Sequence, residues 1–231
     1  IKKTNLGISI LKFKFLLNLG LEKEAKYLKK NYTFENSADI GSNAGYYSNT
    51  LLKISKRVFS FEPIKYHCIN QKKIFKNKNI IVYNFGLGNK KGKKKLFIPK
   101  NNDPEASFIN SNTEFDSIFV NLERGDYFFK NNKIDFIKID VEGYELDVLK
   151  GLSYQFSNFK PLLLIEIEKR HNKNFLKVFN FLNNLNYKIF YLRNENELKE
   201  IPINDINKFL ENKQKIEFLN IEKIVNNFFF K

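Results

Sequence analysis

One short segment, residues 37–47, constrains the fold of this chain most strongly. Its sequence is Ser-Ala-Asp-Ile-Gly-Ser-Asn-Ala-Gly-Tyr-Tyr, which we interpret as the end of a buried strand, a tight turn and the start of a helix. Glycines in the turn let a ligand approach the backbone closely, and the start of the helix offers unpaired N–H groups. A strand, a turn and a helix in this order predict an α/β fold with a ligand site at the turn.

The chain then alternates between strand-like and helix-like segments. The predicted strands are residues 37–40, 57–61, 79–85, 134–141, 161–167 and 187–192. The predicted helices are residues 46–54, 64–75, 144–149 and 175–185. This alternation predicts an α/β fold with a mostly parallel central sheet and helices on both faces.

The two ends and one internal segment follow other patterns. Residues 1–32 have apolar residues at helical spacing, and residues 93–130 form an insertion that can cover a substrate, with an extra strand at 94–99. In the C-terminal part we expect a helix at 206–210 and an extended segment at 216–219.

With 231 residues, the chain suits one domain with a full hydrophobic core. We expect an N-terminal helical segment (1–33), a core (34–192) and a C-terminal extension that completes the same domain (193–231). No run of about 18 apolar residues is present, so no membrane span is predicted. Residues 8–21, the best candidate, are interrupted by lysines and are interpreted as a packed helix or a weak interfacial one.

Cysteine content and charge narrow the expected location and partners. The single Cys68 cannot form an intramolecular disulfide, which favours a cytoplasmic location. The chain begins at Ile1 and contains no methionine, so we expect the true N-terminus to lie upstream. The net charge of +15 comes almost entirely from lysine, and arginine, the usual residue for phosphate and base recognition, is scarce. We therefore interpret the lysines as a solvated surface and do not expect a nucleic-acid partner.

Four predicted strands change from apolar to acidic residues at their carboxyl ends. These acidic residues are Asp39, Glu62, Asp140 and Glu166. In an open α/β sheet the ligand binds beyond these ends, at the point where the strand order reverses. Four acidic ends on one edge therefore indicate a single site.

The acidic residue before the glycine turn narrows the choice of ligand. Asp39 would repel a pyrophosphate, whereas it suits the cationic amine and sulfonium of S-adenosylmethionine (SAM). A dinucleotide fingerprint also needs a glycine where this chain has Asn43, so an NAD-dependent oxidoreductase is the weaker alternative. Glu62 follows the turn by roughly 20 residues, the spacing of a carboxylate that binds ribose hydroxyls. The pair Glu62-Pro63 also suits the start of a helix.

Further acidic residues are candidates for the reaction itself. Asp140 ends a buried strand, where an unpaired charge is costly, so we expect a ligand amine or hydroxyl beside it. Glu166 and Glu168 share one face of their strand and need a positive or protic partner between them. That partner is Arg170 or His171 if the pair is structural, and the substrate if it is functional.

The general base for a substrate hydroxyl is then His171, Glu166 or Glu142, and these stay open as alternatives. One cysteine and two scattered histidines provide no metal-ligand spacing, so no metal site is predicted. Binding of Mg²⁺ by Asp140, Glu142 and Glu166 stays open, because it needs no recognisable motif.

Four blocks of the sequence resemble the FkbM family of SAM-dependent methyltransferases. They are Asp-Ile-Gly-Ser-Asn-Ala-Gly at 39–45, Phe-Glu-Pro at 61–63, Lys-Ile-Asp-Val-Glu-Gly-Tyr-Glu at 138–145 and Glu-Ile-Glu at 166–168. The resemblance covers residues 36–192 and implies a Rossmann-like class I methyltransferase fold. It also implies O-methylation with SAM as cofactor, commonly of a sugar hydroxyl on a glycan, lipopolysaccharide or glycosylated metabolite, as in polysaccharide biosynthesis.

The resemblance further implies roles for individual residues. The residues that would bind SAM are Asp39, Gly41, Asn43 and Gly45 around its methionine part, Glu62 at its ribose, and Gly86 and Leu87, at the end of the third strand, near its adenine. Asp140 and Glu142 would face the reacting hydroxyl, His171 is a further catalytic candidate, and Ser107 matches a serine of the covering loop.

Two alternatives keep the fold but change the function. The first is a nucleic-acid methyltransferase that uses the lysine-rich surface. Base methyltransferases of this class often carry Asn/Asp-Pro-Pro-aromatic where this chain has Asp-Val-Glu-Gly at 140–143, which argues against it. The second is a non-catalytic SAM-binding or partner-binding module, which the retained acidic residues disfavour. The expected partners are therefore SAM and a small-molecule or glycan acceptor.

Overall fold

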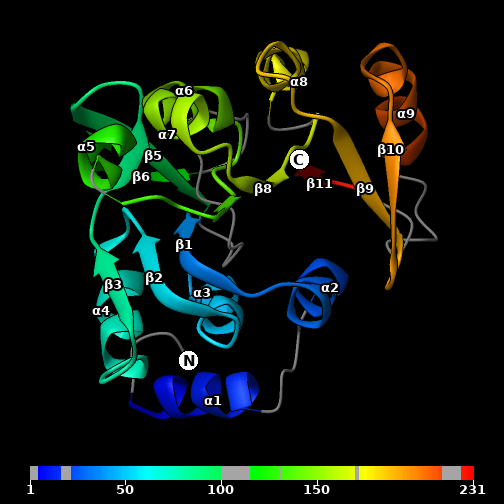
Figure 1. The fold of residues 1–231 in the computed structure, drawn as a ribbon. Helices are drawn as coiled ribbons and strands as arrows, with labels where there is room; N and C mark the ends of the chain where they lie inside the picture. The colour runs from blue at the N-terminus through cyan, green and yellow to red at the C-terminus, as the bar shows by residue number, and fades with distance from the viewer. Residues whose placement is uncertain (1–4, 17–21, 100–114, 131, 170–171, 215–224) are drawn as a thin grey trace.

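The computed structural model (Figure 1) describes residues 5–16, 22–99, 115–130, 132–169, 172–214 and 225–231. Its main sheet has the strand order β10-β9-β11-β8-β7-β1-β2-β3. The bounds of these strands are β1 Phe34–Ile40, β2 Ser55–Phe61, β3 Ile80–Tyr83, β7 Phe136–Ile139, β8 Leu162–Glu166, β9 Ile189–Asn194, β10 Glu197–Ile201 and β11 Asn227–Phe230. All neighbouring pairs from β3 to β8 are parallel, which confirms the predicted mostly parallel sheet.

The strand order reverses between β1 and β7. From β1 the sheet continues to β2 and β3 on one side, whereas β7 and β8 lie on the other. Ligands of open α/β sheets bind at such a switch point, beyond the carboxyl ends of the strands. Gly41 directly follows β1 and Asp140 directly follows β7, so the fold places both residues there.

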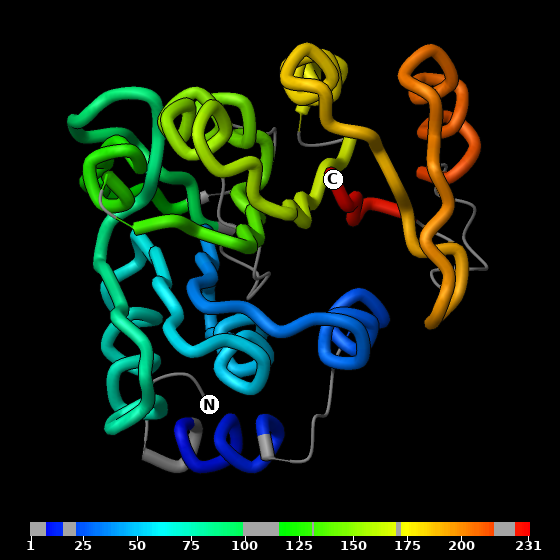
Figure 2. Tube along the Cα trace, in the orientation of Figure 1, coloured from blue at the N-terminus to red at the C-terminus, as the bar shows by residue number. Residues whose placement is uncertain are grey.

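Helices cover both faces of the main sheet, as predicted (Figures 1 and 2). One face packs against α2 (Lys23–Asn31) and α3 (Tyr46–Leu51). The opposite face packs against α6 (Glu145–Gly151), α7 (Ser153–Asn158) and α8 (Phe175–Asn184). Successive side chains of a strand alternate between the two faces.

The alternation along β7 places one charged residue inside the fold. Phe136 belongs to the core beneath α2 and α3, whereas Ile137 and Ile139 belong to the core beneath α6 and α8. Lys138 therefore shares a face with Phe136, and its side chain is fully buried. A buried lysine requires partners, and these lie at the candidate site described below.

A second sheet joins β4 (Gly86–Gly88), β6 (Phe115–Arg124) and β5 (Gly92–Pro99) in that order. The strand predicted at 94–99 lies within β5, and β5 with β6 belongs to the predicted insertion. The other helices of the described residues are α1 (Asn5–Leu16), α4 (Lys65–Ile74), α5 (Gly125–Phe129) and α9 (Ile206–Lys213), which follows a 3-10 turn at Ile203–Asp205. In the described part of the chain, no helix has the length and apolar character that crossing a membrane requires.

The C-terminal part departs most from the sequence-based expectation. Strand β11 lies between β8 and β9 and is antiparallel to both, and β10 pairs antiparallel with β9. The sequence pattern predicts neither strand, and it also misses α5 and α7. The helix predicted at 206–210 lies within α9, whereas the extended segment expected at 216–219 lies outside the described residues.

Candidate active site

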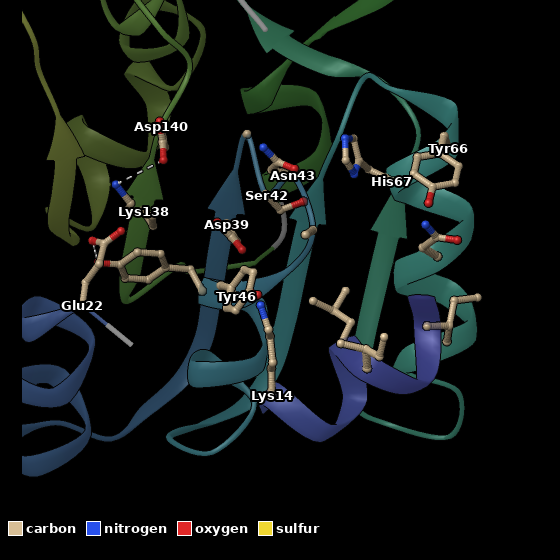
Figure 3. Close-up of a pocket in the computed structure, with 17 residues that line it drawn as sticks. Lys14, Glu22, Asp39, Ser42, Asn43, Tyr46, Tyr66, His67, Lys138 and Asp140 are labelled. Carbon is tan, nitrogen blue, oxygen red and sulfur yellow. Dashed lines mark hydrogen bonds and ion pairs between the residues drawn. The ribbon is translucent and has the colours of Figure 1, made fainter. Parts of the chain in front are cut away.

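Two cavities meet at the switch point of the main sheet. The smaller has a volume of about 270 Å³ and extends over the ends of β1 and β2 and the strand β4. The larger has a volume of about 580 Å³ and lies between the glycine turn, α1 and the start of α4 (Figure 3). Gly41, Asn43 and Asp140 line both cavities. A ligand that occupies both therefore passes over the glycine turn.

The turn after β1 has a backbone that few residues can adopt. Gly41, Asn43 and Gly45 have φ angles of +82°, +47° and +90°. A Cβ atom at Gly41 would overlap the backbone carbonyl oxygen of Asp140. Glycine therefore permits both the left-handed conformation and the close packing of this turn against the end of β7.

Buried hydrogen bonds hold the turn against β2 and α4. Gln71 of α4 donates from Nε2 to Ser42 Oγ at 2.7 Å and to the carbonyl oxygen of Asn43 at 2.8 Å. Ser60 Oγ of β2 lies 2.8 Å from both Ser42 Oγ and Gln71 Oε1. Because these side chains are all buried, their bonds satisfy one another and fix the position of the turn.

Glu62, the acidic end of β2, lies in the smaller cavity. Its carboxylate accepts the backbone N–H of Asn43 at 2.7 Å and that of Ile64 at 2.7 Å. Burial raises the pKa of Glu62 to about 7. The carboxylate thus joins the glycine turn to the start of α4, which agrees with the interpretation of Glu62 as part of a helix start, whereas ribose binding stays a prediction.

Asp39 is the acidic residue at the carboxyl end of β1. Its side chain is buried beside the larger cavity and accepts a hydrogen bond from the hydroxyl of Ser48 at 2.6 Å. Burial raises the pKa of Asp39 to about 6, although Ser48 and Lys138 oppose the increase. Asp39 is paired in register with Lys138 on β7, so the two side chains are neighbours on one face of the sheet.

Lys138 is the centre of a buried charge cluster. Its Nζ lies 3.8 Å from an oxygen of Asp140 and 3.7 Å from an oxygen of Glu166, and it donates to Asn227 Oδ1 at 3.0 Å. Burial lowers the pKa of Lys138, but Asp140, Glu166 and further carboxylates outweigh burial and raise it. Figure 3 shows Lys138 pointing towards Asp140 at one end of the larger cavity.

The pair Glu166 and Glu168 has the protic partner that its spacing predicts. Asn226, just before β11, donates from Nδ2 to Glu166 at 2.6 Å and to Glu168 at 2.8 Å. Burial and the charge of Asp140 raise the pKa of Glu166, and Lys138 only partly offsets them. Asn226 and Lys138 thus hold the Glu166 carboxylate at the edge of the smaller cavity. Arg170 and His171, the partners expected from the sequence, lie outside the described residues.

Glu142 and Gly143 form the turn after β7, and Glu145 begins α6. Glu142 has a φ angle of +49°, which is costly for a residue other than glycine, and Gly143 has +96°. Glu145 accepts the N–H of Gly143 at 2.6 Å and the amide of Asn172 at 2.7 Å, and burial raises its pKa to about 7. Glu145 therefore holds the turn, whereas Glu142 lines the smaller cavity.

The structure brings most of the predicted site residues to the two cavities. Those that line the smaller cavity are Gly41, Asn43, Glu62, Gly86, Leu87, Asp140 and Glu142. Gly86 and Leu87 belong to β4 of the second sheet and not, as expected, to the end of the third main strand. Asp39 lines only the larger cavity. Gly45 lines neither of the two cavities; it is the N-cap of α3, and a Cβ atom there would press against the ring of Phe75. His171 and Ser107 lie outside the described residues.

Sequence reasoning missed Lys138, Asn226 and Asn227. Lys138 could have been found from the sequence, because it is the charged residue in an apolar run from Phe136 to Ile139. No sequence pattern identifies the two asparagines, because they reach the site only through the position of β11 in the sheet. Within the described ranges, no three or more His, Cys, Asp or Glu side chains are grouped as a metal site would require.

Comparison with known proteins identifies the fold and the family. The family model of the methyltransferase FkbM domain matches residues 39–189. Among solved structures, the chain is similar to methyltransferase FkbM from Methylobacillus flagellatus KT, with a TM-score of 0.54 and 18% identity over 85% of this chain and 43% of that one. The chain thus spans less than half the length of that relative. The comparison with curated proteins gives no match.

Two further structures share the fold. A Streptococcus mutans protein described as a methyltransferase, in complex with SAH, has a TM-score of 0.51 and 10% identity, over 90% of this chain and 94% of its own. An rRNA methylase from Streptococcus thermophilus has a TM-score of 0.50 and 10% identity, over 90% of this chain and 93% of its own. The fold is therefore that of the class I methyltransferases. Since the family model also covers the glycine turn, Glu62 and the segment 140–142, this chain belongs to the FkbM family of SAM-dependent methyltransferases.

Proposed function

We propose that this chain transfers a methyl group from SAM to a hydroxyl oxygen of a sugar, in a glycan, a lipopolysaccharide or a glycosylated metabolite. One observation carries the proposal: two cavities of different chemistry converge on Gly41, Asn43 and Asp140 at the switch point of the sheet. Such convergence is what a transferase needs, because its two substrates must meet at one point.

The residues that line the smaller cavity and its junction with the larger one fit SAM. Glu62 offers carboxylate oxygens for ribose hydroxyls, and Gly86 and Leu87, which line the same cavity, offer backbone and apolar surface for adenine. Asp140, where the two cavities meet, and Asp39, on the adjoining wall of the larger cavity, supply negative charge for the cationic methionine part. When bound, SAM supplies an activated methyl group. The protein's own task is to orient the acceptor, exclude water and accept a proton.

The larger cavity fits a sugar-containing acceptor. Tyr46 and Tyr66 offer aromatic faces, and His67 and Asn70 offer hydrogen-bonding groups, all on its lining (Figure 3). Ile8 and Leu11 of α1 add an apolar wall, so an acceptor with an apolar part next to its sugar fits best. Asp140 lies where this cavity meets the smaller one, with a side chain that is 32% exposed.

A hydroxyl acceptor needs a base within hydrogen-bond reach. Asp140 lies where the two cavities meet and Glu142 lines the smaller one, and both are our candidates for that base, with His171 as the third. The left-handed backbone of Glu142 supports this assignment, because strained residues gather at functional sites. Glu166 is bound by Asn226 and Lys138, so we assign it to positioning of the neighbouring charges.

Calorimetry and a transfer assay test the proposal. We expect SAM and SAH to bind and NAD not to bind; binding of NAD alone would refute it. With tritiated SAM and a panel of glycans as acceptors, Glu142→Gln should reduce transfer by about 10²–10⁴-fold while SAH affinity stays unchanged. Glu211→Gln on α9 is the matched control, since Glu211 is exposed and lines neither cavity.

A further inference from the structure

The helix α1 has an apolar surface that the rest of the described chain does not cover. Phe15 is buried, with its ring 5.0 Å from that of Tyr46 and stacked at 5.8 Å on that of Phe75. On the outer side, Ile10 is 37% exposed and Phe13 is 58% exposed. Two large apolar side chains exposed on one side of a helix are a candidate surface for a partner.

Lysines flank this outer face. Ile10 and Phe13 are three residues apart and therefore lie on one side of the helix. At 100° per residue, Lys12 and Lys14 fall on opposite sides of this pair, and both are exposed. Long lysine side chains can lay their apolar stems along a membrane interface and reach the headgroups with their charges. Exposed apolar side chains with lysines beside them can lie at a membrane surface, the apolar groups at the acyl boundary and the ammonium groups at the phosphates.

The neighbouring surface has the same sign of charge. Phe75, on which Phe15 stacks, directly follows α4, whose last turn carries the exposed lysines Lys72 and Lys73. Figure 1 places α1 at the lower edge of the molecule beside this end of α4. The whole chain carries a net charge of +15. An anionic surface is therefore complementary to this side of the protein.

The outer face of α1 also borders the larger cavity. Ile10 and Lys14 are exposed and line the cavity at the same time, so α1 forms part of its rim. Figure 3 shows Lys14 pointing from α1 towards Tyr46. A molecule held at the outer face of α1 would thus have its polar end at the entrance of the cavity.

We propose that α1 docks this protein on an anionic membrane, with Phe13 and Ile10 in the interface and Lys12 and Lys14 at the headgroups. The acceptor then reaches the larger cavity from that surface, which makes it a lipid-linked sugar. This second part rests on the proposed function, whereas membrane binding itself does not depend on methyl transfer.

Co-sedimentation with lipid vesicles tests the docking. The full chain should bind vesicles of equimolar phosphatidylcholine and phosphatidylglycerol and bind phosphatidylcholine alone much more weakly. Phe13→Ser should weaken binding to the anionic vesicles by about ten-fold, because the phenyl ring no longer leaves water. Lys12→Gln should weaken it by about five-fold and should not change binding to neutral vesicles. Neither residue lines a cavity, so the SAH affinity of both variants should equal that of the wild type.

Phe119→Ser is the matched control. Phe119 on β6 is 75% exposed and is paired in register with Lys95, so it has similar chemistry at a place remote from α1. The proposal is overturned if Phe119→Ser weakens vesicle binding as much as Phe13→Ser, or if neutral and anionic vesicles bind equally. It is also overturned if gel filtration shows a dimer that Phe13→Ser dissociates, since a second copy then covers α1. If the wild-type chain binds SAH but no anionic vesicles, the docking alone is refuted. If the wild-type chain does not bind SAH, the proposed function is refuted.

Discussion

The replacement Gly41→Ala tests the reasoning about the switch point most directly. Gly41 has a φ angle of +82°, and a Cβ atom there would overlap the carbonyl oxygen of Asp140. The left-handed conformation costs a non-glycine residue about 1–2 kcal/mol. The added methyl group must also push apart the ends of β1 and β7, and overpacking of this kind costs about 1–3 kcal/mol. We therefore expect the free energy of unfolding to fall by about 2–5 kcal/mol.

The same displacement should weaken the cofactor site. Asp140 and Gly41 line both cavities, so separating them changes the place where the two substrates are proposed to meet. We expect SAH affinity, measured by calorimetry on the folded variant, to fall by at least about ten-fold, or about 1.4 kcal/mol. Urea unfolding followed by circular dichroism gives the change in stability.

Gly92→Ala is the matched control for this prediction. A Cβ atom at Gly92 meets nothing within 4 Å, and its φ angle is not positive. Its free energy of unfolding should stay within about 0.5 kcal/mol of the wild type, with unchanged SAH affinity. If Gly41→Ala behaves like Gly92→Ala in both assays, the argument from backbone geometry and close packing is wrong.

Three further predictions follow from the same site. Lys138→Met should lower the free energy of unfolding by about 3–5 kcal/mol in urea, because it leaves buried carboxylates without their cation; an unchanged midpoint would contradict the cluster. Glu142→Gly should leave stability equal or higher, since it relieves the φ of +49°, while methyl transfer to the acceptor falls; a clear loss of stability would show that the Glu142 side chain holds the fold. Burial raises the pKa of Asp39 to about 6 and those of Glu62 and Glu145 to about 7, so the folded state keeps protons that the unfolded chain releases near its ordinary values of 3.8 and 4.5. The contribution of these groups to the free energy of unfolding is complete below those ordinary values and is lost as the pH rises to about 7, by at most about 1.4 kcal/mol per pH unit and group. Thermal unfolding without ligand should therefore show a higher midpoint temperature at pH 5 than at pH 8.

The sequence predicts the parts of this fold that depend on local patterns. The glycine turn, the alternation of strands and helices, and the acidic ends of β1, β2, β7 and β8 are all visible along the chain, and each has a local physical cause. The switch point follows from these patterns together, because parallel strands place their carboxyl ends on one edge. This explains why Gly41, Glu62 and Asp140 are found around connected cavities.

The missed elements depend on contacts between distant segments. Strand β11 has four residues, and its pattern Asn-Phe-Phe-Phe does not say that it lies between β8 and β9. Asn226 reaches Glu166 across 60 positions of sequence, and Asn227 reaches Lys138 across 89. The sequence predicts that Glu166 and Glu168 need a protic partner, but only the sheet order identifies Asn226.

The buried charges of the site do not balance, and the imbalance bears on its ligand. In the described residues, Asp39, Asp140 and Glu166 surround one ammonium group, that of Lys138, whose pKa they raise. One cation compensates one carboxylate, so the remainder either take up protons or face a positive ligand. Burial and the neighbouring carboxylates raise the pKa values of Asp39 and Glu166, which is the cost of holding these like charges together. A cationic ligand relieves the same imbalance directly, whereas a pyrophosphate would increase it. The preference for SAM over NAD, inferred in the sequence from Asp39 and Asn43, thus gains a further support in the cluster around Lys138.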